Sequence, residues 1–144
     1  MVGIGSDHGG FELKNVLYEH LKGLGYDVMD YGVFDKKSVD YPDIAEKVCT
    51  EVADGKLDFA VLVCGTGIGI SIAANKIKGI RCALVTNEYS AEMAKRHNNA
   101  NVIAFGGRTT GSDLAVSILN KYLGAEFDGG RHQNRIDKIS ALEK

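Results

Sequence analysis

The chain has 144 residues, 44% of them hydrophobic and 25% charged, which is the composition of a globular protein and enough length for one domain. The formal net charge of −2 favours neither nucleic acid nor a membrane surface as a partner. The opening residues MVGIGSDHGG lack the basic and apolar regions of a signal peptide, and every apolar stretch is too short to span a membrane.

Short β-like runs alternate with helical patterns along the chain. The expected strands are 2–6, 26–32, 58–64, 81–85 and 101–105. The expected helices are 11–24, 42–53, 70–77, 89–98, 112–124 and 131–144. Apolar residues recur at helical spacing within these helices, for example at Ile136, Ile139 and Leu142 in the last one. The alternation predicts the α/β class: one domain over residues 1–144, with a five-stranded parallel sheet and helices on both of its faces.

The cysteines Cys49, Cys64 and Cys82 are odd in number and irregularly spaced, without a CxxC pair. This pattern predicts free thiols rather than disulfides or a zinc site, and hence a reducing, cytoplasmic setting with no bound metal. Cys49 and Cys82 fall inside a helix and a strand and are expected in the core, whereas Cys64 ends a strand.

Reactive side chains follow several of the expected strands. Asp7 and His8 follow the first strand, Cys64 ends the third, and Arg108 follows the fifth. The second strand leads into a loop that ends near Tyr41. Because the carboxyl ends of parallel strands meet at one edge of a sheet, we expect these groups to lie together there.

The segment CGTGIG places Gly65, Gly67 and Gly69 between Cys64 and the next helix. Glycines let backbone N–H groups close around an anion, and the helix start adds its positive end. Such surroundings stabilise a thiolate and an oxyanion beside it. Two plainer interpretations stay open, because a cysteine is often a small buried hydrophobe and glycines often form an ordinary strand-to-helix turn. No GK[ST] follows, which excludes a Walker motif.

Plainer interpretations also exist for the charged candidates. Asp7 is placed to cap the first helix, and His97 lies at a helix end where an imidazolium would favourably meet the dipole. Arg131 and Arg135 share one helix face and could clamp a phosphate, or be solvated surface side chains.

Five motifs taken together resemble the type B ribose-5-phosphate isomerases, within the wider group that includes galactose-6-phosphate isomerase subunits. The motifs are SDHGGFELK (6–14), DYPDIA (40–45), CGTGIGISIAANK (64–76), HNNANVIAFGGR (97–108) and GGRHQNRI (129–136). The resemblance implies interconversion of D-ribose 5-phosphate and D-ribulose 5-phosphate through a cis-enediolate, without metal or organic cofactor.

The resemblance also implies residue roles. Cys64 matches the proton-transferring base, whereas some relatives carry a glutamate at the position of Ile70. His97 matches the acid/base that opens the sugar ring, assisted by Asp7 and Thr66. The positions that match substrate contacts are His8, Tyr41, Gly65, Gly67, Gly69, Asn98, Arg108, Arg131 and Arg135.

The family fold is a Rossmann-like three-layer α/β/α sandwich. Its members are homodimers, in some cases tetramers, and His97 and Asn98 would reach the site from the neighbouring subunit. We therefore expect the C-terminal helix, from about residue 130, at the subunit interface. Two alternatives remain: an isomerase of allose 6-phosphate or galactose 6-phosphate, and a non-catalytic sugar-phosphate-binding module, which would need the glycines and arginines but neither Cys64 nor His97.

Overall fold

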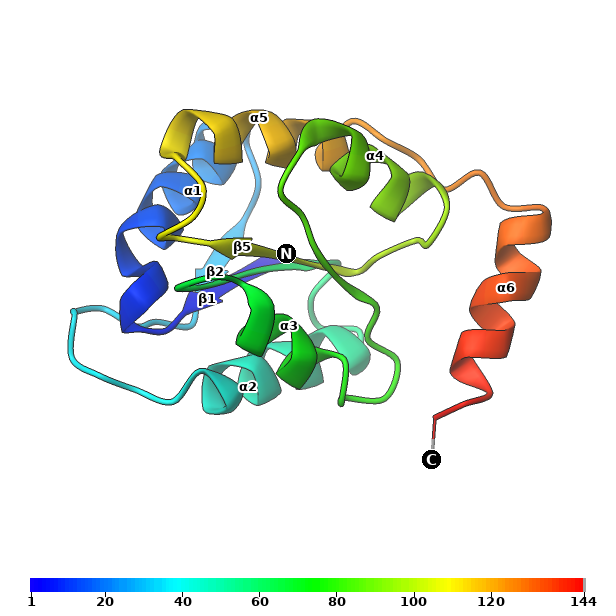
Figure 1. Ribbon diagram of the computed structural model, residues 1–144, viewed down its shortest axis with the longest axis horizontal. Helices are drawn as coiled ribbons and strands as arrows, with labels where there is room; N and C mark the ends of the chain where they lie inside the picture. Colours follow the sequence, from blue (N-terminus) through cyan, green and yellow to red (C-terminus); the bar gives the residue numbers. More distant parts are fainter. Residues whose placement is uncertain (144) are drawn as a thin grey trace.

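A computed structural model describes residues 1–143, and a sheet lies at its centre between layers of helices (Figure 1). The sheet has five parallel strands in the order β2-β1-β3-β5-β4. The strands are β1 (Val2–Ser6), β2 (Val28–Asp30), β3 (Ala60–Cys64), β4 (Cys82–Leu84) and β5 (Val102–Gly106). β1, β3 and β5 are buried along their whole length. The expected parallel sheet is confirmed, although β2 and β4 are shorter than their sequence patterns.

Helices cover both faces of the sheet, which confirms the three-layer α/β/α arrangement. The helices are α1 (Phe11–Gly23), α2 (Tyr41–Ala53), α3 (Ile68–Ala74), α4 (Glu88–Arg96), α5 (Ser112–Leu123) and α6 (Arg131–Ser140). α1, α4 and α5 cover one face, and α2 and α3 cover the other (Figure 1). Each face has its own apolar core. No helix within residues 1–143 has the length and apolar character needed to cross a bilayer.

The sequence starts its helices with recognisable signals. Pro42 occupies the first turn of α2, where its missing N–H is not needed. Asn87 caps α4, and its side chain accepts a hydrogen bond from the Ser90 N–H.

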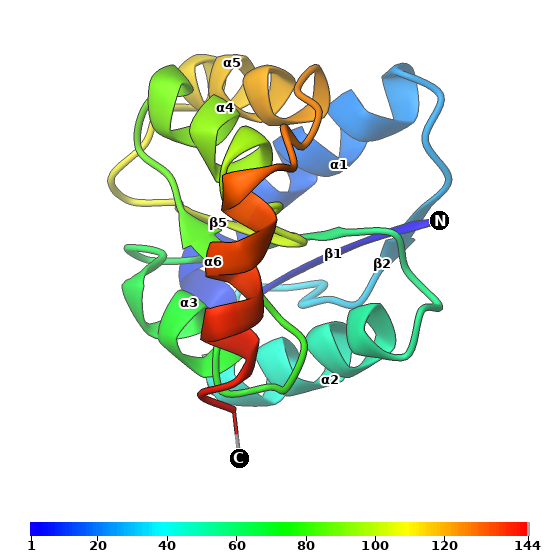
Figure 2. The same ribbon diagram turned by 90° about the vertical axis from the view of Figure 1, so that its right-hand side faces the viewer.

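α6 stands apart from the layers at one end of the molecule (Figures 1 and 2). Its Ile136 is buried, but Ile139 and Leu142 are 45% and 79% exposed, so the expected inner stripe is covered at only one of its three positions in a single chain. Two of the three stripe positions therefore stay exposed to solvent in one chain.

The strand order reverses between β1 and β3, because the chain adds β2 on one side of β1 and the other strands on the opposite side. Ligands in open α/β sheets bind at such a switch point, beyond the carboxyl ends of the strands. We call that side of the sheet the carboxyl edge and the opposite side, where the strands begin, the amino edge. Ser6 and Cys64 are the last residues of β1 and β3, so they mark the switch point.

Candidate active site

The turn after β3 encloses the sulfur of Cys64. The side chain is 4% exposed, and its Sγ accepts a hydrogen bond from the Gly67 N–H at 3.2 Å. Gly67 has φ +79°, and a Cβ there would lie 2.5 Å from Leu84 Cδ1 and 2.9 Å from the Phe105 carbonyl carbon. Only glycine fits both the backbone conformation and the space. The turn thus fixes where the sulfur lies.

The turn and helix start that follow Cys64 also carry unpaired backbone donors. Within the described chain, the N–H groups of Thr66, Gly69 and Ile70 make no hydrogen bond to the protein. Gly69 and Ile70 lie in the first turn of α3, where N–H groups have no partner within the helix, and Thr66 lies in the turn before it. The Ile68 N–H is bonded to Thr66 Oγ1 at 3.2 Å, which holds the threonine side chain over the turn. Free donors beside a thiol are what an oxyanion forming next to Cys64 would need.

The loop after β5 joins the same turn. The Gly107 N–H donates to the Cys64 carbonyl at 2.8 Å, and the Arg108 N–H donates to the Gly65 carbonyl at 2.9 Å. A Cβ at Gly65 would lie 3.2 Å from Arg108 Nη1, so the guanidinium lies directly against this glycine. A fixed positive charge therefore borders the turn that holds the thiol.

The loop after β1 packs against both the turn after β3 and the loop after β5. Asp7 is 7% exposed, and its Oδ1 accepts from the Gly10 N–H at 3.1 Å, which caps the 3₁₀ turn His8–Gly10 ahead of α1. Asp7 therefore caps this short turn and not α1 itself, whose N-cap residue is Gly10. His8 Nδ1 accepts from the Val39 N–H at 3.3 Å. A neutral His8 ring therefore carries its hydrogen on Nε2, where it can be donated to a ligand.

Tyr41 begins α2 and lies over the start of α3. A Cβ at Gly69 would come within 2.5 to 2.7 Å of the Tyr41 ring and hydroxyl. The tyrosine therefore closes one side of the turn and is itself 37% exposed. The carboxyl edge thus brings together the predicted residues Asp7, His8, Tyr41, Cys64, Gly65, Thr66, Gly67, Gly69 and Arg108.

The remaining four candidates lie at the amino edge. His97 ends α4 as its C-cap residue, as expected, and Asn98 follows it. Arg131 and Arg135 lie one turn apart at the start of α6, on the opposite side of the molecule from the carboxyl ends of the strands (Figure 1). One chain therefore does not bring His97, Asn98 and the two arginines together with Cys64.

His97 has two neighbours that sequence reasoning did not identify. Its ring stacks on His132, with centroids 4.2 Å apart and planes 10° from parallel, and its Nε2 lies 3.9 Å from Asp128 Oδ2. Burial, then the neighbouring His97, Arg131 and Arg135, lower the pKa of His132, and Asp128 opposes this. The alternation of His132 with the two arginines was the available sequence signal.

Among residues 1–143, His97, Asp128 and His132 form a group that could offer ligand atoms to a metal ion, within 4.8 Å of one another. The nearly parallel rings do not direct their in-plane nitrogen lone pairs at one point. Arg96 Nε also binds Asp128 Oδ1 at 3.2 Å. The group is therefore arranged for hydrogen bonding and stacking rather than for holding an ion.

A hollow of about 810 Å³ lies between α6 and the chain that joins α3 to β4. Ile77, Ile80, Ile139 and Leu142 supply apolar walls, and Asn98 lies at its border. This hollow belongs to the amino edge and not to the surroundings of Cys64. The exposed half of α6 therefore faces a concave, partly apolar surface.

Comparison with known proteins identifies the class to which this fold and site belong. The sequence profile described as Ribose/Galactose Isomerase matches residues 2–139. The chain belongs to this family of sugar isomerases. The ribose-5-phosphate isomerase B of Escherichia coli (strain K12) is 46% identical over 143 residues, covering 99% of this chain and 96% of that protein.

Solved structures agree with this assignment. The ribose-5-phosphate isomerase B of Clostridium thermocellum superposes with a TM-score of 0.97 at 51% identity, covering 98% of this chain and 95% of that one. The ribose-5-phosphate isomerase B of Mycoplasma genitalium, solved with bound ribulose-5-phosphate, gives a TM-score of 0.93 at 42% identity, covering 97% and 93%. The resemblance stated from the motifs is confirmed.

Proposed function

We propose that this protein interconverts D-ribose 5-phosphate and D-ribulose 5-phosphate. The observation that carries the proposal is the thiol of Cys64, held in a turn whose free N–H groups belong to Thr66, Gly69 and Ile70, with Arg108 beside it. Relatives at 46% and 51% identity that are named ribose-5-phosphate isomerase B support the choice of substrate.

The proposed proton transfer uses Cys64 as the base. The thiolate takes the proton from C2 of the open-chain aldose, the electron pair forms the C1–C2 double bond, and the C1 carbonyl electrons move to O1. O2 then loses its proton while O1 gains one, the C2 carbonyl forms, and the thiol returns the carbon-bound proton to C1. Negative charge grows on the sugar oxygens, where the free N–H groups of Thr66, Gly69 and Ile70 can stabilise it. Donors that bind the charged transition state more strongly than they bind the substrate raise the turnover number.

We assign ring opening and phosphate binding to the remaining candidate site residues. His97 would act as acid and base at the ring oxygen, with Asp7 and Thr66 assisting, while Tyr41 and Asn98 contact the sugar. The Nε2–H of His8 and the guanidinium groups of Arg108, Arg131 and Arg135 would hold the phosphate. Anchoring the phosphate places C1 and C2 next to the base.

The proposal requires a second copy of the chain. Because His97, Asn98, Arg131 and Arg135 lie at the amino edge, they can meet Cys64 only from another subunit. We infer a homodimer in which α6 lies at the interface and each site is shared. We place the activity in the cytoplasm, in keeping with three free thiols, and assign it no metal or organic cofactor.

The test is conversion of ribose 5-phosphate in EDTA by the wild type and by Cys64→Ala, together with a measurement of substrate affinity. A general base contributes ~10²–10⁴-fold, so we expect turnover to fall by about that factor while affinity stays nearly unchanged. Cys82→Ala, which removes a half-buried thiol outside the site, is the matched control and keeps its activity. An equal loss of affinity in Cys64→Ala would mean that the residue only packs the site.

The substrate range follows from the same assay. A wild-type protein that does not convert ribose 5-phosphate but does convert allose 6-phosphate or galactose 6-phosphate would establish the hexose alternative. Binding of all three without conversion would establish a sugar-phosphate-binding module.

A further inference from the structure

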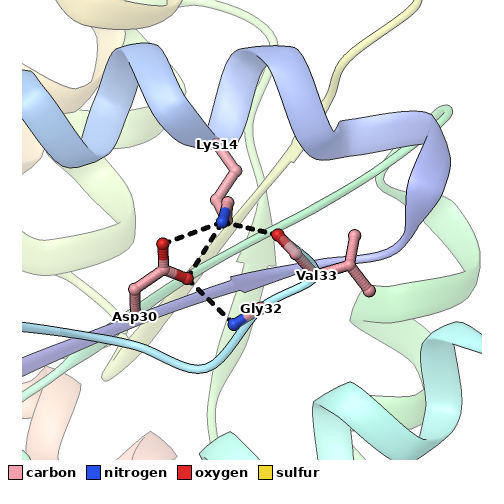
Figure 3. Close-up of polar contacts among 4 residues, drawn as sticks. All are labelled: Lys14, Asp30, Gly32 and Val33. Atoms are coloured by element: carbon pink, nitrogen blue, oxygen red, sulfur yellow. Dashed lines mark hydrogen bonds and ion pairs between the residues drawn. The ribbon is translucent and has the colours of Figure 1, made fainter. Parts of the chain in front are cut away.

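Lys14 is among the largest fully buried side chains of residues 1–143, although it carries a charge. A buried ammonium group is unfavourable unless each of its protons finds an acceptor. Here Nζ donates to Asp30 Oδ1 at 3.0 Å, to Asp30 Oδ2 at 2.8 Å and to the Val33 carbonyl at 2.7 Å (Figure 3). The three donors of the lysine are therefore all used.

The acceptors of Lys14 lie where the chain leaves the sheet. Asp30 is the last residue of β2, and its Oδ1 also accepts from the Gly32 N–H at 2.9 Å. The Ser6 N–H donates to the Gly32 carbonyl at 2.7 Å, and the Val33 N–H donates to the Ser6 carbonyl at 3.0 Å. The side chain of Lys14 and these two backbone hydrogen bonds to Ser6 together fix the path of the chain beside the last residue of β1.

That path leads to the candidate active site. The irregular segment 31–40, here called the rim segment, runs from the end of β2 to the start of α2. Its Val39 N–H is bonded to His8, and it ends next to Tyr41, which lies over Gly69. The position of the rim segment therefore affects two proposed substrate contacts.

Little else holds the middle of the rim segment. Residues 34–38 are all exposed, so they contribute little apolar burial. An ion pair between Lys36 and Glu12, with side chains 67% and 80% exposed, also reaches the segment from α1. Exposed pairs of this kind stabilise a structure very little. The buried contact of Lys14 with Val33 is the stronger anchor.

We propose that Lys14 is a positioning residue for the isomerisation: by anchoring Val33 and Asp30, it sets the rim segment so that His8 and Tyr41 are placed to receive the substrate. The kinetic part of this proposal rests on the proposed function. Lys14 itself does not touch the substrate. Its loss should therefore weaken substrate binding more than it slows the chemical step.

The experiment compares Lys14→Met, the double variant Lys14→Met/Asp30→Leu and the control Glu12→Gln. Removing one member of a buried pair leaves an unpaired charge, whereas removing both restores much of the lost stability. The double variant is the deciding one, because it keeps the fold while lacking the anchor. Asp30→Asn, which keeps the shape of the side chain, takes its place if neither Lys14 variant folds.

Two readouts are used. In the Lys14 variants, hydrogen exchange at the Val39 amide accelerates about tenfold or more, since the three charge-assisted hydrogen bonds of Lys14 are lost. KM for ribose 5-phosphate rises about tenfold and kcat changes less than about threefold. Glu12→Gln leaves exchange and KM unchanged.

Wild-type exchange and wild-type KM in the folded double variant would overturn the proposal and leave Lys14 a structural residue only. Accelerated exchange with an unchanged KM would equally overturn the positioning role. An inactive wild-type protein would refute the proposed function instead. In that case altered exchange at Val39 would still support the anchoring of the rim segment, and unaltered exchange would refute it.

Discussion

At the scale of single residues, Gly69 offers a way to disturb the candidate site without disturbing the core. In Gly69→Ala the new methyl group would collide with the end of the Tyr41 side chain, 2.5 to 2.7 Å away. A half-exposed tyrosine can rotate away, and alanine is favoured over glycine within a helix. We expect unchanged or slightly higher thermal stability and a KM raised about tenfold.

Substitutions at two other glycines serve as comparisons for this prediction. Gly111→Ala places a methyl group in open space at negative φ, so it should leave KM unchanged; because Gly111 is the N-cap residue of α5, it should lower stability by no more than about 1 kcal/mol. Gly67→Ala combines φ +79° with a clash against the Phe105 backbone, so it should lose about 1–3 kcal/mol of unfolding free energy. Calorimetry and steady-state kinetics on the three variants check this order. A Gly69→Ala variant as unstable as Gly67→Ala would contradict it.

Which residues could be foreseen follows from how local their roles are. Asp7, Cys64 and Gly67 were predicted because a cap, a strand end and a tight turn are each written in a few neighbouring residues. Lys14 was missed, since its burial depends on Asp30 and Val33, which come from another element. Nothing in the spacing of one helix marks a lysine as paired inside the core.

At the scale of elements, the contact between the end of α4 and the start of α6 should weaken in acid. The pKa of His132 in the folded protein is lowered by burial and then by His97, Arg131 and Arg135. A histidine with a lowered pKa favours the folded state above its ordinary value of about 6.5, and this contribution is lost as the pH falls below that value. The stability of α6 against local opening should fall accordingly.

Hydrogen exchange over residues 131–140, measured from about pH 7.5 to about pH 5.5 after correction for intrinsic rates, checks this. His132→Gln should flatten the pH dependence. His20→Gln, in a histidine that contacts Asn120 of α5 and not α6, should not. A dependence that survives in His132→Gln would assign it to another group.

The sequence predicted which helices and strands exist better than it predicted what packs against them. Every expected strand and helix is present, because each carries its own apolar periodicity and turn residues. The inner stripes were partly wrong: Val16 and Leu24 of the first expected helix are 39% and 54% exposed. Ile139 in α6 and Leu142 just beyond it are also exposed. Periodicity locates an apolar face, but whether that face is covered depends on what packs against it.

At the scale of the whole molecule, the proposed shared site makes a prediction about mixtures. Cys64→Ala and His97→Ala should each be nearly inactive alone. In a mixed dimer, one site combines both substitutions and the other combines an intact Cys64 with an intact His97. Random reassociation should therefore restore about a quarter of wild-type activity, since half of the dimers are mixed and each has one intact site.

The assay unfolds and refolds the two variants together and compares them with variants refolded separately and then combined. As a control, Cys64→Ala mixed with Arg108→Ala should give no recovery, because both residues belong to the carboxyl edge of one chain. Equal recovery in both mixtures, or none in either, would contradict sharing between the two edges.

The whole-molecule arrangement was only partly accessible from the sequence. The alternation of elements predicted the parallel sheet, but the strand order β2-β1-β3-β5-β4 depends on the path of each crossover, which local patterns do not specify. The grouping of residues after β1, β3 and β5 was nevertheless predicted, since it requires only that the strands be parallel. The distance of His97 from Cys64 within one chain likewise follows from its place before β5 rather than after it.

The separation of the candidate residues onto two edges has a consequence for heredity. If each site draws on two chains, a damaged copy of the gene does not simply halve the amount of enzyme, because its product also enters pairs with intact chains. Such a pair keeps one working site as long as the damage is confined to one edge. After a gene duplication, each copy could lose a different edge, and the two products would then survive only as unlike partners.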